Sequence, residues 1–305
     1  MKTLTIFTPT FNRAYCLNGC YQSLIRQTNK DFVWMIIDDG STDNTKELVR
    51  DWQNNNNGFE IIYIYKENGG MHTAYNTAYA NMTTELSMNV DSDDWLTDDA
   101  VEKVLKFWNK HKRPDVGGIY ALDSFENGKI IGEKFPDNLT EFKGWGYKII
   151  FYKDNNGKKK SVRITGDKKF IGVNSIINQY PPIPVFEGEK YYSLYFKQHY
   201  IERDYSILIL NEPVCIVEYR ADSNTNMMFK QDTESPKGFC EERRFVMKNA
   251  PTFKLRFMSA IHYVAESIFA KDRRFLKNST NKPCTLLSII PGIGLYMLIR
   301  RKVKT

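Results

Sequence analysis

Short apolar runs alternate with segments of helical periodicity over the first 120 residues of the chain. Strands that alternate with helices in this way pair in parallel, because each helix carries the chain back to the edge where the next strand begins. Strands are expected at residues 4–8, 32–37, 60–65, 86–90 and 117–122, and helices at residues 14–27, 42–53, 72–81 and 98–110. The alternation therefore predicts the α/β class, with a Rossmann-like, mostly parallel central sheet flanked by helices.

The rest of the chain is less regular, and its 305 residues correspond to about two folding units. A polar hairpin tip is expected at residues 154–160. Further strands are expected at residues 129–132, 207–210 and 214–219, the last two separated by a turn at Glu212 and Pro213, and a short helix is expected at residues 191–198.

The positive charge of the chain is concentrated at its C-terminal end. Residues 241–305 contain 14 Lys and Arg residues against 4 Asp and Glu residues, whereas the whole chain contains 43 against 36. The part before residue 241 is therefore slightly acidic, which argues against a nucleic-acid enzyme. A basic end segment suits an anionic membrane surface, so we expect a membrane partner and no nucleic acid.

Two apolar patterns lie in this basic segment. Residues 251–275 predict an amphipathic helix, with apolar side chains at helical spacing at Phe257, Ile261, Val264 and Ile268. The apolar run at residues 286–299 is shorter than the about 20 residues that cross a bilayer. We expect this run to lie in a membrane interface, with a helix packed on the rest of the protein as the alternative.

The first ten residues lack the basic start and long apolar stretch of a secretory signal, so a cytoplasmic location is expected. The five cysteines are odd in number. No Cys or His pair lies near Cys16 and Cys20 to complete a zinc site, which favours reduced thiols packed in the protein.

Polar residues follow each of the first four expected strands, at the edge where ligands bind in open parallel sheets. These segments are residues 8–13, 38–43, 66–70 and 91–94. Carboxylates at the ends of buried strands need donors or a cation. In an extended segment Asp91 and Asp93 would point to one side, where they could hold one divalent ion, or one of them the ion and the other a sugar hydroxyl.

The third of these segments suits an anion. Lys66 supplies a positive side chain, and Gly69 and Gly70 allow close backbone approach ahead of a helix N-terminus. A simple turn and helix cap would have the same residues. Phe11, after the first strand, could stack on a base or belong to the core.

Taken together, residues 8–13, 36–42, 68–76 and 91–95 resemble the successive motifs of family 2 glycosyltransferases of the bacterial cell-envelope polysaccharide type. The resemblance implies the GT-A fold and transfer of a sugar from a nucleotide-diphosphate donor, with inversion at the anomeric carbon. It also implies a divalent metal, Mn²⁺ or Mg²⁺. The match covers about the first 120 residues.

The resemblance also assigns roles within the motifs. Phe11 would flank the nucleotide base, Asp39 would accept from the edge of the base, and Lys66 would lie near the nucleotide. Asp91 would contact the ribose or the sugar, and Asp93 would be the metal ligand that bridges to the diphosphate. The nucleotide-sugar-binding set is completed by Pro9 and Ser92, and Asp38 would support the turn after the second strand.

Inversion requires a general base that takes the proton of the acceptor hydroxyl. The family usually supplies it from a Glu-Asp pair, where this chain has Glu189 followed by Lys190. Glu189 is the preferred candidate because it directly precedes the helix expected at residues 191–198, and Glu187 is the second. Either could instead be a charge at a helix N-terminus. His199 is a weaker candidate for the base, and His72 is a candidate for contact with the diphosphate or the acceptor.

The resemblance thus predicts a GT-A catalytic domain at residues 1–225, with a nucleotide-sugar half at 1–120 and an acceptor half at 121–225. A basic, amphipathic helical region follows at 240–305. The expected partners are a UDP-sugar, a saccharide or lipid-linked acceptor, and the inner face of the cytoplasmic membrane. Two alternatives remain: a sugar-phosphate nucleotidyltransferase, disfavoured by the lack of a Gly-rich basic loop after the first strand, and a non-catalytic nucleotide-sugar-binding membrane scaffold.

Overall fold

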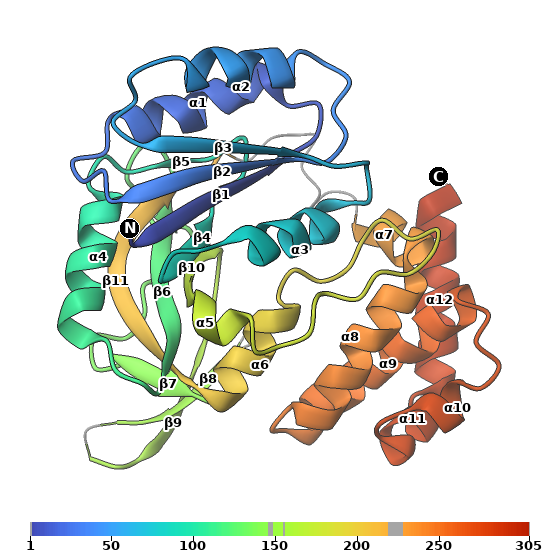
Figure 1. Cartoon of the computed structure of the whole chain (residues 1–305). Coiled ribbons are helices and arrows are strands. Elements are labelled where there is room, and N and C mark those ends of the chain that lie inside the picture. Colours follow the sequence, from blue (N-terminus) through green and yellow to red (C-terminus); the bar gives the residue numbers. More distant parts are fainter. Residues whose placement is uncertain (1, 146–148, 155, 219–227, 305) are drawn as a thin grey trace. The chain divides into compact units, whose positions relative to one another are not determined.

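The structure is a computed structural model of the chain, and it describes residues 2–145, 149–154, 156–218 and 228–304. Nine of the described strands form one sheet, in the order β3-β2-β1-β4-β10-β6-β11-β5 with β7 paired to β11 (Figure 1). Their bounds are β1 (Leu4–Thr10), β2 (Phe32–Asp38), β3 (Glu60–Tyr65), β4 (Leu86–Asn89), β5 (Trp95–Leu96), β6 (Val116–Ser124), β7 (Glu141–Lys143), β10 (Lys168–Val173) and β11 (Ser206–Ile216). A separate hairpin joins β8 (Ile149–Lys153) and β9 (Lys159–Arg163).

Most strands of the large sheet run in one direction. Strands β3, β2, β1 and β4 pair in parallel, and so do β6 and β11. Strand β10 is antiparallel to both β4 and β6, so those two strands also share a direction. The predicted α/β class with a mostly parallel central sheet is confirmed.

Helices cover both faces of the N-terminal strands. The helices of the sheet unit are α1 (Ala14–Ile25), α2 (Thr45–Gln53), α3 (Met71–Asn81), α4 (Ala100–His111), α5 (Asn174–Ile177) and α6 (Phe196–Asp204). Helices α1 and α2 lie on one face of β1–β3 and α3 lies on the other (Figure 1). Because side chains alternate along a strand, Trp34 stacks with Tyr21 of α1, whereas Phe7 packs against Tyr75 of α3.

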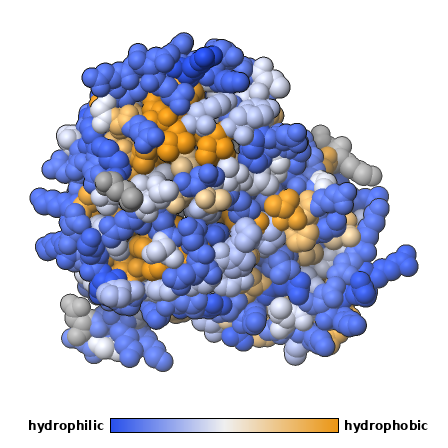
Figure 2. Space-filling model, in the orientation of Figure 1, coloured by the Kyte–Doolittle hydropathy of each residue, from blue (hydrophilic) through white to orange (hydrophobic). Residues whose placement is uncertain are grey.

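Strand β3 ends the sheet on one side, so its outer edge has no strand neighbour in the described chain. The face drawn in Figure 2 is mainly hydrophilic, and apolar residues gather over the strands β1–β3.

Packing divides the chain into two compact units. The first consists of Met1–Pro182 and Lys197–Glu218, and the second of Ile183–Phe196 and Tyr219–Thr305. The helices of the second unit are α7 (Met228–Glu234), α8 (Pro236–Asn249), α9 (Phe253–Phe269), α10 (Phe275–Asn278), α11 (Lys282–Leu287) and α12 (Ile289–Lys304). The predicted domain boundary at residue 225 lies outside the described residues.

Three predictions about the positions of strands and helices are wrong. Residues 129–132 form no strand, since Ile130 makes only an isolated bridge with Ser124. Strand β11 continues through Pro213, where its register against β6 shifts instead of turning back. The helix expected at residues 191–198 begins only at Phe196.

The apolar run at residues 286–299 is divided between α11 and α12. In the part of the chain that the structure describes, no helix combines the length and the apolar character needed to span a membrane.

A buried carboxyl group, Glu266 of α9, makes the stability of the helical unit depend on pH. Burial raises the pKa of Glu266 from 4.5 to about 7, although Arg243 lowers it through an ion pair of 3.1 Å. Asp232 and Glu242 raise it further. A folded state that holds a proton more tightly than the unfolded state loses stability as the pH rises from the unfolded pKa to the folded pKa.

Glu266→Gln is therefore expected to remove up to about 3 kcal/mol of pH dependence between pH 4.5 and about pH 7. In the unaltered protein the free energy of unfolding should fall as the pH rises through this window. Guanidinium unfolding at both ends of the window measures it. Glu241→Gln, at a side chain that is 41% exposed, is the control and should retain the dependence. Equal slopes for the two variants would contradict the assignment.

Candidate functional site

The ends of the parallel strands meet at one edge of the sheet. The amide of Asp39 donates to the carbonyl of Thr10 (2.8 Å), and the amide of Lys66 donates to the carbonyl of Asp38 (2.9 Å). The amide of Val90 donates to the carbonyl of Phe7 (2.9 Å). The segments that follow β1, β2, β3 and β4 therefore lie side by side, at the edge where open parallel sheets bind ligands.

Asp38 holds the turn that follows β2. Its Oδ1 accepts from the amide of Ser41 (2.7 Å), and its Oδ2 accepts from the hydroxyl of Tyr63 (2.5 Å). Burial and this bond raise the pKa of Tyr63. Both oxygens of the buried carboxylate are thus satisfied by the protein itself.

Asp39 joins the β2 end to the β3–α3 loop. Its Oδ1 accepts from the amide of Gly69 (3.0 Å) and pairs with the ammonium of Lys66, while its Oδ2 accepts from the amide of Gly70 (2.8 Å). Asn68 donates to the carbonyl of Asp39 (2.8 Å). Two of the predicted nucleotide-binding residues, Asp39 and Lys66, are therefore in direct contact.

Glycine is needed where these two loops touch. Gly40 has a φ of +89°, and a Cβ at this position would lie 2.8 Å from the amide nitrogen of Asn68. Gly70 has a φ of +93° and precedes the first turn of α3. Both positions favour glycine because L side chains rarely adopt these angles.

The segment after β1 is tied to the segment after β2. Asn12, with a φ of +54°, receives the amide of Thr42 at its Oδ1 (2.7 Å) and donates its own amide to Ser41 (2.8 Å). Phe11 is 46% exposed, so the alternative that it belongs to the core is wrong. Pro9 lies inside β1, buried and opposite Ile37 of β2.

Residues 91–94 form a turn and not the extended segment expected from the sequence. The amide of Asp94 donates to the carbonyl of Asp91 (3.0 Å), and Asn89 donates to Asp91 Oδ1 (3.1 Å). Ser92 is buried. The Asp93 side chain is 19% exposed, and its Oδ2 lies 3.8 Å from Arg13 Nη1.

Two carboxyl groups of this turn, Asp91 and Asp94, are costly to ionise. Burial raises the pKa of Asp91, which Lys169 lowers and Asp93 raises again. Burial also raises the pKa of Asp94 to about 8, with the same opposing effects from Lys169 and the neighbouring carboxylates. The turn therefore offers several carboxylate oxygens, and the positive charge nearby is too small to balance them. A cation that bound at this turn would be stabilised by these oxygens.

A hard divalent ion fits this donor set. Among the described residues no three His, Cys, Asp or Glu side chains converge on a single metal site. Mg²⁺ is commonly held by one or two carboxylates together with substrate phosphates and water, so a smaller protein contribution suffices. Asp93, which reaches solvent, and Asp91 are the residues that could hold the ion.

Sequence reasoning missed a buried cation beneath the turn, Lys169 of β10, which is 6% exposed. Burial lowers the pKa of Lys169, but Cys215 and Asp123 are the largest of the neighbours that raise it well above its usual value. Asp123, at the end of β6, is itself 2% exposed, and burial raises its pKa to about 6. Lys169, Ile171 and Val173 are two residues apart along β10, so their side chains lie on the same face of the strand, and all three are buried. This spacing could have predicted the inward position of Lys169.

Glu189 belongs to the second unit and binds the N-terminus of α8. Its Oε1 accepts from the amide of Lys237 (3.0 Å), and its Oε2 accepts from the amide of Gly238 (2.9 Å). A Cβ at Gly238 would lie 2.9 Å from the carbonyl of Tyr191. The carboxylate therefore accepts hydrogen bonds from the N-terminus of a helix about fifty residues later in the sequence. Its role as general base stays a prediction.

The other candidate residues differ in their surroundings. Glu187 is exposed, whereas His199 is 6% exposed and stacks on Trp145. His72 is 2% exposed in α3. The roles of Glu187 and His199 as alternative bases, and the contact of His72 with the diphosphate or the acceptor, also stay predictions.

Comparison with known proteins identifies the family. The family model described as Glycosyl transferase family 2 matches residues 5–180. Glycosyltransferase GlyA of Streptococcus pneumoniae serotype 4 is 32% identical over 147 residues, which is 46% of this chain and 21% of that protein. Chondroitin synthase of Pasteurella multocida is 38% identical over 141 residues, 46% of this chain and 14% of that protein. The chain thus spans about a fifth or less of these relatives.

Two solved structures share the fold over almost the whole chain. S. aureus TarS 1–349 in complex with UDP-GlcNAc has a TM-score of 0.57 at 15% identity and covers 98% of this chain and 81% of that one. Mannosyltransferase PcManGT from Pyrobaculum calidifontis, in complex with GDP-Man and Mn²⁺, has a TM-score of 0.56 at 16% identity, with 99% and 83% coverage. Both confirm the GT-A fold. Because the family match covers more than half of the chain and includes all four strand ends of the site, the protein belongs to glycosyl transferase family 2.

Proposed function

We propose that the protein transfers a sugar from a nucleotide-diphosphate donor, a UDP-sugar, to a saccharide or lipid-linked acceptor in cell-surface polysaccharide synthesis. The observation that carries the proposal is the set of four strand ends at one edge of the sheet, which combines an exposed aromatic ring, a Gly-Gly helix start and a carboxylate turn. The ligands of the two structural neighbours, UDP-GlcNAc and GDP-Man, support a donor of this class.

In the proposed donor complex, the exposed ring of Phe11 stacks on the base. The edge of the base donates to Asp39. Both oxygens of Asp39 already accept hydrogen bonds from the β3–α3 loop. The donor group of the nucleotide base therefore replaces the ammonium of Lys66 at Oδ1. The ammonium of Lys66, on a long flexible side chain, then turns toward the negative charge of the nucleotide.

Asp93 would hold the divalent ion, Mn²⁺ or Mg²⁺, beside the diphosphate, and Asp91 would contact the ribose or the sugar. Such an ion neutralises the charge that develops on the leaving nucleoside diphosphate. Arg13, 3.8 Å from Asp93, adds a cation to the same edge. Glu189, with Glu187 as the alternative, takes the proton of the acceptor hydroxyl. The acceptor oxygen then bonds to the anomeric carbon on the face opposite the diphosphate, the bond from that carbon to the diphosphate breaks, and the configuration is inverted.

The proposed location is the cytoplasm, at the inner face of the membrane, where a lipid-linked acceptor is presented. The charge of residues 241–305 supports this location, since basic groups are attracted to anionic lipids at about 1 kcal/mol each.

Calorimetry with UDP tests the donor site. Asp39→Asn should weaken UDP binding by about 1–3 kcal/mol, because the amide replaces an acceptor oxygen by a donor group facing the loop amides. Asp51→Asn, an exposed position in α2, is the matched control and should bind UDP as the unaltered protein does. Unchanged affinity in the Asp39 variant would remove this residue from the donor site.

A further inference from the structure

We propose that the outward face of α11 and α12 is a binding site for anionic phospholipid, with acyl chains against its apolar side chains and phosphate at Arg301 and Lys302. The location of this site on a membrane rests on the proposed function. Its chemistry rests on the packing of α12 and on the charge of the segment.

Close packing fixes which side of α12 faces outward. Gly292 and Ser288 are buried against α9, and a Cβ at Gly292 would lie 2.5 Å from the Cβ of Val264. Ser288 also donates to the carbonyl of Phe257 (3.5 Å). Because only a small residue fits at this crossing, the helix cannot rotate to bury its larger side chains.

Large apolar side chains are exposed on the outward side of α12 and at the end of α11, where Leu286 and Leu287 lie. Their exposed fractions are 83% at Ile290, 63% at Leu287, 55% at Leu286, 52% at Met297, 47% at Leu298 and 42% at Ile293. Within α12, residues 290, 293 and 297 recur at helical spacing, so they form one stripe on this helix. A helix that buries small residues and exposes a continuous apolar stripe marks an interaction site.

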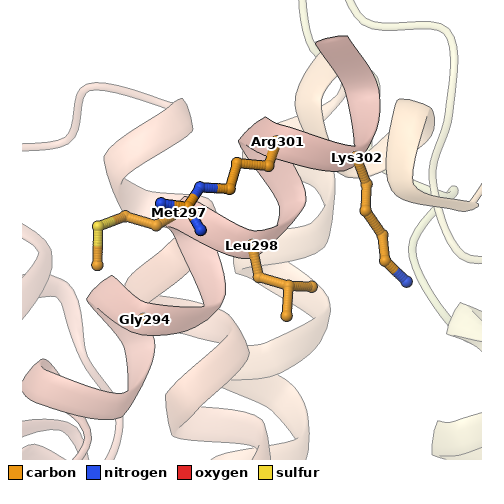
Figure 3. Close-up of a pocket in the computed structure, with 5 residues that line it drawn as sticks. All are labelled: Gly294, Met297, Leu298, Arg301 and Lys302. Carbon is orange, nitrogen blue, oxygen red and sulfur yellow. The ribbon is translucent and has the colours of Figure 1, made fainter. Parts of the chain in front are cut away.

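The stripe leads into a hollow of about 430 Å³, lined by Gly294, Met297, Leu298, Arg301 and Lys302 (Figure 3). Apart from its two chain neighbours and the adjoining backbone of α12, nothing lies within 4 Å of the place where a Cβ of Gly294 would be. In Figure 3 the side chains of Arg301 and Lys302 extend on either side of Leu298. Apolar side chains, followed about one helical turn later by two adjacent cations, match the acyl chain and the phosphate of a phospholipid.

The charge of the segment distinguishes between two possible partners of this face, an anionic lipid surface and a second copy of the chain. Residues 273–305 contain no Asp or Glu. A second copy of the same face would bring like charges together, whereas an anionic lipid surface would be attracted to every basic side chain of the segment. The structure therefore favours lipid over self-association.

Flotation of the full-length protein with vesicles tests the site. The unaltered protein should bind vesicles of phosphatidylglycerol and phosphatidylcholine, and bind phosphatidylcholine alone much more weakly. Lys302→Glu should reduce binding to the anionic vesicles about 20-fold, since each unit of charge accounts for about 1 kcal/mol, or about fivefold. Ile290→Glu should reduce it by at least about tenfold, because a large apolar side chain no longer inserts.

Matched controls lie in the sheet unit. Lys159→Glu makes the same charge change on the exposed β9, and Phe151→Glu replaces an exposed apolar residue of β8; both should bind vesicles normally. Met297→Trp should gain fluorescence that phosphatidylglycerol with brominated acyl chains quenches, and Phe151→Trp should not.

Three results would overturn the proposal: equal binding to neutral and anionic vesicles, equal losses in Lys302→Glu and Lys159→Glu, or a dimer that Ile290→Glu dissociates. Donor hydrolysis is measured on the same samples. Loss of lipid binding with hydrolysis retained separates this proposal from the proposed sugar transfer.

Discussion

Replacing Asp93 by Asn is expected to lower metal-dependent turnover of the donor by about 10³-fold while the fold is retained. Asp93 is partly exposed at the turn after β4 and is the carboxylate proposed to hold the divalent ion at the diphosphate. An amide is a weaker ligand without charge, so the negative charge on the leaving group loses its compensation. Turnover of the nucleotide sugar at saturating Mn²⁺ measures the effect, and thermal unfolding checks the fold.

Asp98→Asn is the control for this prediction. Asp98 lies five residues later, is 60% exposed and pairs with Arg26 at the surface, so its loss should leave turnover nearly unchanged. Full activity of the Asp93 variant in the presence of EDTA would remove both Asp93 and the metal from the mechanism.

Glu189→Gln is expected to lower turnover by about 10²-fold with donor affinity unchanged, because a base acts on the acceptor hydroxyl and not on the bound nucleotide. The variant also loses one of the two carboxylate oxygens that accept from the amides of Lys237 and Gly238. A decrease of about 1 kcal/mol in the free energy of unfolding should accompany the loss of turnover.

The two effects are separated by a pair of variants. Glu187→Gln, at an exposed residue of the same segment, should retain both turnover and stability. If Glu189→Gln loses stability but keeps its turnover, the carboxylate has only the structural role at α8. If Glu187→Gln alone loses turnover, the base lies two residues earlier.

The N-terminal strands could be predicted because local pattern and tertiary environment agree there. Each of the first four strands is a short apolar run bounded by polar turn residues, and β3 (Glu60–Tyr65) has the bounds expected. The strand-end motifs could be located for the same reason, since a parallel sheet brings the carboxyl ends of β1–β4 to one edge.

Contacts between residues distant in sequence determine the features that the local sequence pattern could not predict. Strand β11 continues through Pro213 because a register shift against β6 accommodates the missing amide donor there. The contact of Glu189 with α8 joins residues 48 and 49 positions apart, and no local pattern predicts it. Lys169 was missed because its carboxylate neighbours come from other strands and turns.

Turnover of nucleotide sugars in the absence of an acceptor tests the central claim most directly. UDP- and GDP-sugars are incubated singly with the full-length protein and Mn²⁺ or Mg²⁺, and release of the nucleoside diphosphate is measured. We predict release from a UDP-sugar that is abolished by EDTA and by Asp93→Asn and retained in Asp98→Asn. Absence of release and of binding for every donor, with either metal, would contradict the assignment of this edge of the sheet as a nucleotide-sugar site.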